Sequence, residues 1–473
     1  MKISNYPVIV LGSGISSLGA IDELISKGIK PLVIDIGNII TPRKKDKNNT
    51  IICGKSWYGN YEGYSIYDKK NPFRIKSKRL CSSHQYGGYG AVWTGSFFLP
   101  FREELNINDQ EYKDLIFYAK IFQDKYTKLS DISFFESREE LNNPDIILKK
   151  ARIAICPNHL KLSKKDGTAP SSISQLGPIF NPALILKKYI ENNLIDYHGN
   201  SYVVSINNNE KKITLFKDNK LKNIKFEKIY VCCGCINSLY LAANHIPQKK
   251  YFEIKIAPSI NFPLISFRKR NKTKTVVNQN YYAPVNFLII RKVKGIRDSI
   301  YCQISNLNLE ILEKANIPKF LRNIINFFSE YIYIAQLRLS SKNSYPFICK
   351  INSFKNIEDP GCIDIKESKR KLKKFVLIKS FITVSSFLKK RGMFTNILFI
   401  WIYKLITKSD FCGWHISSNL ATKIDDKLIS DIYFIDSASL GEVPATTIVP
   451  ILYGRSRALV NYSFDKKITK IKS

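Results

Sequence analysis

Two glycines and an acid near the N-terminus have the types and spacing that hold a phosphate-linked ligand. The run Gly12-Ser13-Gly14-Ile15-Ser16-Ser17 follows an apolar stretch and opens a predicted helix. Gly12 permits a tight turn, Gly14 lets the backbone approach a pyrophosphate, and the small Ser17 keeps helix and sheet close. Ser16 lies in the first helical turn, where free N–H groups and the positive dipole end attract an anion. The pattern predicts a dinucleotide site.

Asp35 strengthens this interpretation. It ends the second apolar stretch, Pro31 to Ile34, and stands 23 residues after Gly12. A carboxylate at about this distance accepts hydrogen bonds from ribose hydroxyls in dinucleotide-binding βαβ units. The alternative is an ordinary tight βα turn with no ligand, but strand, helix, strand and terminal acid together favour the dinucleotide.

A second glycine-rich section and one late histidine are the other candidates for chemistry. The glycines from Gly87 to Gly95 exclude a regular helix or strand interior and suit a loop whose backbone approaches something flat or charged. His415 comes shortly before the last predicted strand, and imidazole is a base of near-neutral pKa. The alternative for His415 is a structural role beside Cys412-Gly413.

The elements that must position these residues predict an α/β fold. A β-meander ends in the strand Lys228–Cys233, and Gly234 then opens a helix, as in a late return to the nucleotide-binding sheet. The chain returns once more with a strand at 431–436 and a helix from Thr446. We therefore expect a Rossmann-like FAD/NAD(P)-binding domain assembled from discontinuous segments, with an inserted α+β substrate domain. The expected division is 1–102, 183–262 and 408–473 for the nucleotide domain, 103–182 for a helical and irregular part, and 263–407 for the substrate domain.

These motifs, in this order, resemble the glucose–methanol–choline (GMC) family of FAD-dependent oxidoreductases. The motifs are the N-terminal glycine loop, Gly87 to Gly95, Val231 to Ala242, the His415 segment and Asp436 to Val460. The divergent bacterial branch associated with surface-polysaccharide genes is the more similar. The resemblance implies FAD as cofactor and oxidation of a hydroxyl group on an alcohol or a sugar.

The resemblance also implies roles for individual residues. Gly12, Gly14 and Ser17 would hold the FAD pyrophosphate, and Asp35 the adenosine ribose. The segment with Gly87, Gly88 and Trp93 would lie along the flavin, Val204 would meet the adenine through its backbone, and Asp436 would bind the ribityl chain. The helix near Thr446, with Thr447 in its first turn, would direct its N-terminus at the flavin pyrimidine edge. His415 would be the active-site base.

The chain departs from the family after these residues. The usual second His or Asn is missing from Val443-Pro444-Ala445-Thr446-Thr447, so Thr446 offers only a hydroxyl. Asn419 is a candidate polar partner for His415, or alternatively a loop cap. Two other functions remain as alternatives to hydroxyl oxidation. One is a flavin reductase or monooxygenase that takes electrons from NAD(P)H, and the other is a catalytically degenerate glycan-binding protein.

Composition limits the partners and the compartment. The formal charge of +35 comes with lysines dispersed along the chain. Two explanations are open: a coding bias toward lysine, or an anionic partner such as a glycan or membrane surface. No nucleic-acid motif accompanies the charge, and the ten cysteines show no metal spacing. The Cys232–Cys235 spacing suits packing at a strand end, with a redox dithiol as the alternative. We expect a cytoplasmic protein without a resident metal.

One segment leaves membrane contact open. Pro318 to Ile334 combines Lys319 and Arg322 with apolar residues at helical spacing. Packing on its own domain is one interpretation, and peripheral contact with the anionic inner face of a membrane, or with a lipid-linked glycan, is the other.

Overall fold

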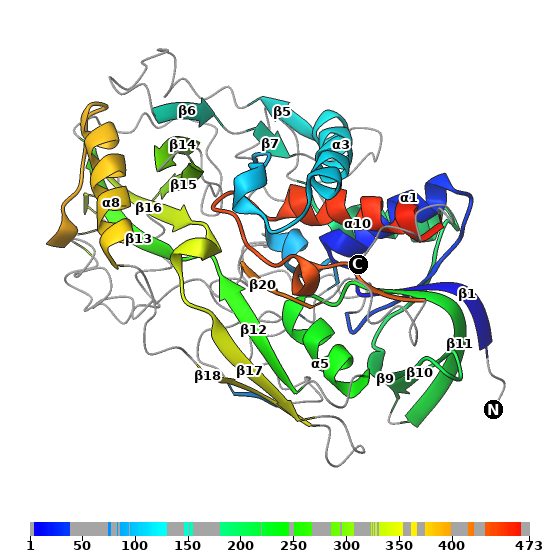
Figure 1. Cartoon of the computed structure of the whole chain (residues 1–473). Coiled ribbons are helices and arrows are strands. Elements are labelled where there is room, and N and C mark those ends of the chain that lie inside the picture. The colour runs from blue at the N-terminus through cyan, green and yellow to red at the C-terminus, as the bar shows by residue number, and fades with distance from the viewer. Residues whose placement is uncertain are drawn as a thin grey trace.

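The computed structural model describes about three fifths of the chain, and its strands form four sheets (Figure 1). The described residues are 4–37, 74–76, 83, 86–93, 95–129, 146–150, 152–154, 180–218, 220–245, 250–266, 285–293, 296–306, 323, 325, 327–328, 331–352, 361–366, 374–398, 415–420 and 431–464.

The largest sheet has seven strands in the order β8-β2-β1-β11-β10-β9, with β21 also paired to β11. Its strands are β1 (Ser4–Leu11), β2 (Leu32–Ile34), β8 (Asp196–His198), β9 (Tyr202–Asn207), β10 (Lys212–Lys217), β11 (Lys220–Val231) and β21 (Ile432–Phe434). Strands β8, β2, β1, β11 and β21 run parallel, whereas β9 and β10 are antiparallel. Three pieces of chain distant in sequence therefore build one sheet.

Strand β11 belongs to both parts of this sheet because its sequence changes character along its length. Its first residues are mostly exposed, as suits a meander with one face in water. Its last three, Tyr230 among them, are buried on both faces, as suits a central parallel strand. The meander thus leads without a break into the nucleotide-binding core.

Helices cover the sheet: α1 (Ile15–Ser26), α4 (Pro182–Glu191), α5 (Cys235–His245) and α10 (Val449–Phe464), with α3 (Asp109–Tyr126) packed on α10 (Figure 1). Two glycines allow the close approach of these helices. A Cβ on Gly19 would lie 2.5 Å from the Tyr453 carbonyl oxygen, and one on Gly454 would lie 2.5 Å from that of Leu115. Both sites exclude any larger residue without backbone movement.

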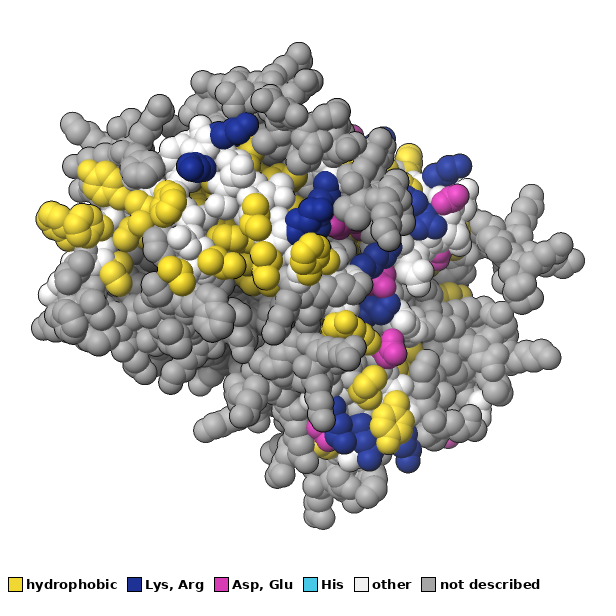
Figure 2. Space-filling view, turned by 60° about the vertical axis from the view of Figure 1, so that its left-hand side comes forward, with side chains coloured by type: hydrophobic (Ala, Val, Ile, Leu, Met, Phe, Trp, Pro, Cys, Tyr) yellow, Lys and Arg dark blue, Asp and Glu magenta, His cyan; other side chains and the backbone are white. Residues whose placement is uncertain are grey.

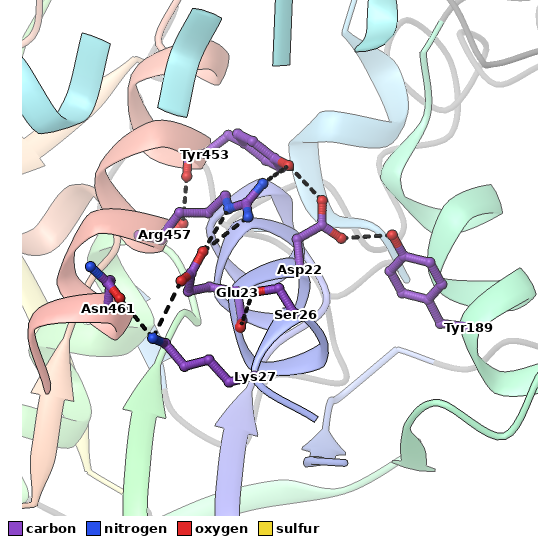
Figure 3. A network of polar contacts seen from close by, with 9 residues as sticks. Asp22, Glu23, Ser26, Lys27, Tyr189, Tyr453, Arg457 and Asn461 are labelled. Atoms are coloured by element: carbon purple, nitrogen blue, oxygen red, sulfur yellow. Dashed lines mark hydrogen bonds and ion pairs between the residues drawn. The ribbon is translucent and has the colours of Figure 1, made fainter. Parts of the chain in front are cut away.

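A buried polar network fixes α1 against α4 and α10 (Figure 3). Tyr189 and Tyr453 donate to the two carboxylate oxygens of Asp22 at 2.6 and 2.5 Å. Arg457 donates twice to Glu23, at 2.9 and 3.1 Å. Both carboxylates are more than nine-tenths buried, so their partners offset a large desolvation cost. The network sets the position of α1, whose other end faces the cavity described below.

The second region is built on a six-stranded antiparallel sheet, β19-β13-β16-β15-β14-β6. Its strands are β6 (Ile146–Lys150), β13 (Ser259–Ser266), β14 (Val285–Val293), β15 (Ile296–Asn306), β16 (Ile332–Leu339) and β19 (Met393–Phe394). Helix α8 (Lys374–Lys389) packs Phe381 and Phe387 against Phe262 and Phe287 of the sheet. The other face of β14 and β15 meets the nucleotide region through Phe98 and Ala445.

Two smaller sheets and several 3₁₀ turns complete the described structure. One sheet is β20-β12-β17-β18-β3, from β3 (Arg74–Lys76), β12 (Tyr251–Ile256), β17 (Phe347–Asn352), β18 (Cys362–Lys366) and β20 (Ile416–Ser418). The other is β4-β7-β5, from β4 (Ser96–Phe97), β5 (Thr127–Leu129) and β7 (Arg152–Ala154). The turns are η1 (Gly88–Val92), η2 (Arg102–Glu104), η8 (Ser341–Asn343) and η9 (Ser437–Ser439).

The predicted α/β fold class is confirmed. Two local predictions need correction. The last helix begins at Val449 rather than near Thr446, with Pro450 in its first turn, where a proline needs no N–H partner. The 103–182 part, expected to be helical and irregular, contains the strands β5, β6 and β7 besides α3. About half of the segment 318–334, with its helical spacing of apolar residues, lies outside the described residues.

The domain boundaries remain predictions. Strand β13 crosses the expected boundary after residue 262, and β6, from the 103–182 part, joins the six-stranded sheet. Among the described residues no helix is long and apolar enough to span a bilayer.

Candidate dinucleotide and active site

A cavity of about 1810 Å³, part of it open to solvent, lies where the parallel strands β1, β2, β11 and β21 end. This edge of a parallel sheet is where open α/β folds bind ligands. The cavity extends from the N-terminus of α1 to side chains of β15, β16 and the start of β20. Its lining residues come from both the nucleotide region and the six-stranded sheet, so it can take an extended ligand that reaches from the glycine loop to β15 and β16.

The glycine loop forms one wall. Gly12 has φ +98°, and a Cβ there would lie 2.5 Å from the Cys232 carbonyl oxygen, so the approach of β11 requires glycine. Gly14 precedes the first turn of α1 in extended conformation, and a Cβ there would meet no protein atom within 4 Å. Gly14 and Ser16 line the cavity. The space beside Gly14, in front of the free N–H groups of α1, is a cradle for an anion.

Asp35 ties the loop to its neighbours. Its Oδ2 accepts hydrogen bonds from the Ser13 hydroxyl and, at 3.2 Å, from the Tyr197 hydroxyl. Ser13 Oγ in turn accepts from the Gly87 N–H at 2.8 Å. Burial raises the pKa of Asp35, and these hydrogen bonds oppose that shift. Asp35 thus joins the loop after β1 to the turn that opens η1, and it lines the cavity between them.

The glycine-rich segment forms the short helix η1 and faces Gly14. Gly87 has φ +87°, and a Cβ on Gly88 would lie 3.3 Å from the Gly14 Cα. Gly88 and Trp93 line the cavity. The Trp93 Nε1 is buried and has no hydrogen-bond partner within the described part of the chain. A buried donor without a partner is costly, so this N–H favours an acceptor on a bound ligand.

Asp436, 1% exposed, anchors the opposite wall. Its Oδ2 accepts from the Gly234 N–H at 2.7 Å and the Ser238 hydroxyl at 2.5 Å, and its Oδ1 accepts from the Ala438 N–H at 2.8 Å. Burial raises its pKa, while these bonds and nearby Arg455 oppose the shift. Asp436 fixes the starts of α5 and η9 and still faces the cavity.

The far end of the cavity carries His415, Arg338, Gln336 and Gln303. His415 is held through its backbone, because its carbonyl accepts from the Ala257 N–H at 3.1 Å just before β20. Burial, and then the charge of Arg338, hold the pKa of His415 well below its usual value. The imidazole is therefore neutral at pH 7 and able to take a proton.

Hydroxyl groups near α10 add to the site. Thr447 lines the cavity, whereas Thr446 is fully buried behind it. Neither hydroxyl has a hydrogen-bond partner among the described residues, and the same is true of the buried Nδ1 of His415. Polar atoms left unmatched around one cavity indicate that its occupant is polar.

The structure brings most of the predicted site residues to one cavity. Those that line it are Gly12, Gly14, Ser16, Asp35, Gly88, Trp93, Gly234, His415, Asp436 and Thr447. Five others do not: Ser17, Gly87, Val204, Asn419 and Thr446. Val204 is buried, and its neighbours Ser201, Tyr202 and Val203 face the cavity instead. The Asn419 side chain is exposed outside the cavity, so the geometry does not pair it with His415.

Sequence reasoning missed Ser13, Tyr197 and Arg338. Ser13 lies in the glycine loop that the sequence identified. Its hydrogen bond to Asp35, however, joins the end of β1 to the end of β2, which sequence spacing does not show. A signal for Arg338 was present, since Gln336 and Arg338 interrupt an otherwise apolar strand, β16, at alternate positions. Two polar side chains on one face of a strand, Arg338 buried and Gln336 half-buried, are unusual unless that face meets a polar site.

The cysteines at the end of β11 pack in the wall. Burial raises the pKa of Cys232, Cys233 and Cys235 well above the usual value, so all three are protonated, poorly nucleophilic thiols. They are free cysteines. Among the described residues no group of three or more His, Cys, Asp or Glu is placed to hold a metal ion.

Comparison with solved structures shows the fold along the whole chain. Pyridoxine 4-oxidase from Mesorbium loti aligns with a TM-score of 0.63 at 10% identity, over 96% of this chain and 98% of that one. A formate oxidase from Aspergillus oryzae, in a mutant made to study FAD modification, aligns with a TM-score of 0.60 at 10% identity, over 97% and 98%. Another formate oxidase structure aligns with a TM-score of 0.56, over 98% of both chains. No family model and no curated protein sequence matches the chain.

Proposed function

We propose that this protein is an FAD-dependent oxidoreductase that oxidises a hydroxyl-bearing carbon of an alcohol or a sugar. The single observation that supports it most is one continuous cavity with an anion cradle at one end and a neutral imidazole at the other. The likeness of the whole chain to two oxidases, one described with FAD modification, is consistent with this assignment.

The residues present fit the cofactor. The N-terminus of α1 beside Gly14 would hold the pyrophosphate, and Asp35, at the end of β2, the adenosine ribose. The first residues of α10, with Thr447, would face the flavin with a positive dipole end. Bound FAD supplies a two-electron acceptor that takes the hydride from the carbinol carbon.

His415 would accept the hydroxyl proton of the substrate. Its neutral state at pH 7 is required for this role, and Arg338 helps to maintain it. The strand residues around Arg338 would exclude water from that end of the cavity. A sugar of a surface glycan or its precursor is the substrate class that the GMC resemblance favours.

The test is anaerobic reduction of the purified, FAD-loaded protein by a panel of alcohols and sugars, followed by absorbance. We expect the flavin to bleach with at least one of them and His415→Ala to slow bleaching by a hundredfold or more, the usual weight of general base catalysis at about 10²–10⁴. His198→Ala is the matched control, because His198 lies in β8 outside the cavity and contacts Tyr6.

Other outcomes refute this function. A protein that takes up no FAD has no redox role of this kind. Bleaching by NADPH alone, with no response to any hydroxyl compound, would instead support a flavin reductase or monooxygenase. Tight glycan binding by a redox-silent protein would support the degenerate, non-enzymatic alternative.

A further inference from the structure

Helix α8 exposes apolar side chains where a surface helix normally carries polar ones. Its buried face packs on the six-stranded sheet through Phe381, Val384 and Phe387. On the opposite side Phe375, Ile378 and Ile382 are 78%, 44% and 59% exposed. An ordinary amphipathic helix on a globular protein buries one apolar stripe and turns charge to water. The outer face of α8 therefore exposes apolar side chains to water, which is unfavourable in free energy, and the packing of the chain gives no reason for it.

The exposed apolar surface continues onto the neighbouring edge of the sheet. Edge strand β19 follows α8 and pairs with the end of β13, which brings Phe394 beside Ile265. Both are 37% exposed, and Ile397 and Leu398, just after β19, are 42% and 62% exposed. We call the set the α8 surface: Ile265, Phe375, Ile378, Ile382, Phe394, Ile397 and Leu398. Figure 2 shows hydrophobic side chains gathered on the side of the molecule that carries α8.

The charge around this surface has one sign. Residues 374–398 contain Lys374, Lys379, Lys389, Lys390 and Arg391 and no Asp or Glu. Lys379, Lys389 and Lys390 are exposed, and Lys379 stands in the helix between Ile378 and Ile382. The adjoining sequence keeps this sign, since 369–373 adds four basic residues and no acid. An apolar stripe set among lysines and free of acids suits lipid acyl chains below anionic headgroups.

We infer that the α8 surface docks this protein on an anionic membrane, with Phe375, Ile378 and Ile382 inserted at the headgroup boundary. Apolar insertion and lysine–headgroup attraction act together, so binding requires both the aromatic and aliphatic stripe and the basic residues. The inference differs from membrane contact through 318–334, a segment of which about half lies outside the described residues. It is independent of the redox chemistry, since α8 packs on the opposite face of the six-stranded sheet from Phe98 and Ala445.

The test is flotation of the full chain with phosphatidylcholine vesicles that contain or lack phosphatidylglycerol, at low and high salt. We expect binding to the anionic vesicles alone, weakened by salt. The variant Phe375→Ser/Ile378→Ser/Ile382→Ser should bind at least about tenfold more weakly, because it loses three inserted side chains. Lys379→Gln/Lys389→Gln/Lys390→Gln should bind about a hundredfold more weakly, because it loses three charges that the anionic headgroups attract.

Matched controls separate this surface from general stickiness and general charge. Phe117→Ser/Tyr251→Ser removes two side chains that are each 60% exposed on other elements. Lys220→Gln/Lys222→Gln/Lys225→Gln removes the same charge from exposed positions of β11. Both should bind as the unmodified chain does, and thermal unfolding of all variants checks their folding. No binding at low salt, equal losses in controls and α8 variants, or an α8-dependent dimer in the absence of lipid would overturn the inference.

Discussion

Replacing Gly14 with alanine separates the needs of the fold from the needs of the ligand. Gly14 has φ −76° and ψ −169°, a conformation open to any residue, and a Cβ there would meet no protein atom within 4 Å. The substitution removes freedom from the unfolded chain, worth about 0.4–1 kcal/mol, and weakens the helix N-cap by a similar amount. We expect the free energy of unfolding of the cofactor-free protein to change by less than about 1 kcal/mol.

FAD binding should respond very differently. The new methyl group would occupy the cradle at the N-terminus of α1 and hold the pyrophosphate away from the N–H groups. Hydrogen bonds to charged groups contribute about 1.5–3 kcal/mol each, so losing one or two raises the Kd for FAD about tenfold to a hundredfold or more. Titration of the cofactor-free protein with FAD, read by flavin fluorescence, measures this, and urea unfolding measures stability in parallel.

Gly12→Ala is the contrasting variant. Its Cβ would lie 2.5 Å from the Cys232 carbonyl oxygen, at φ +98°, so it should destabilise the protein by several kcal/mol, on the order of 2–4, whether or not FAD is present. The reasoning is refuted if Gly14→Ala binds FAD within threefold of the unmodified protein, or if it unfolds as readily as Gly12→Ala.

Three further predictions concern packing, charge and pH. Gly454→Ala should lower the free energy of unfolding by about 1–3 kcal/mol in urea, because the methyl group would meet the Leu115 carbonyl oxygen at 2.5 Å and separate α10 from α3. Asp436→Asn should cost about 2–4 kcal/mol in the same assay, since one of the two oxygens that accept from Gly234, Ser238 and Ala438 becomes an NH₂ group and leaves its donor without an acceptor. Arg338→Gln should raise the pKa of His415, because the nearby positive charge now lowers it. In the proposed mechanism the neutral imidazole accepts the proton, so the acid limb of kcat/KM should move to higher pH; an unchanged limb would show that Arg338 does not act on His415.

The dinucleotide half of the site could be predicted because its determinants are local. Gly12, Gly14 and Asp35 lie within one βαβ unit, where turn geometry and strand length fix their relative positions. Asp436 and Gly234 were also identified, since each ends a strand that a parallel sheet must bring to the same edge. What could not be predicted is that the Asp436 carboxylate accepts a hydrogen bond from the N–H of Gly234, 202 residues away.

The reactive end could not be predicted in the same way, because it depends on pairing between distant strands. His415 comes just before β20 and Arg338 lies in β16, and these strands belong to two different sheets. The two residues lie near each other only because those sheets adjoin. A sequence pattern reports which face of a strand is buried, but not which other strand lies opposite. Asn419 was chosen for its closeness to His415 in sequence, and its exposed side chain shows how little that closeness implies.

A two-residue passage between sheets explains how His415 and Arg338 are held together. Strand β12 ends at Ile256 and β13 begins at Ser259, so the chain crosses from one sheet to the other at Ala257-Pro258. Ala257 N–H donates to the His415 carbonyl at 3.1 Å, and the Pro258 carbonyl accepts from the Leu339 N–H, next to Arg338, at 2.9 Å. A single extended segment thus aligns both residues.

The same border is fixed to the loop that leads into α10. Glu442 accepts hydrogen bonds from Lys255 of β12 and from Ser341 of η8, and Ser341 and Val443 exchange backbone and side-chain bonds at 2.7 and 2.8 Å. Ser417 of β20 donates to the Gly441 carbonyl at 2.9 Å. The base end of the cavity and the helix N-terminus that would face the flavin are therefore joined through a buried acid. Because Glu442 contacts neither His415 nor the cavity, its effect on catalysis would be positional, acting through the strands it connects.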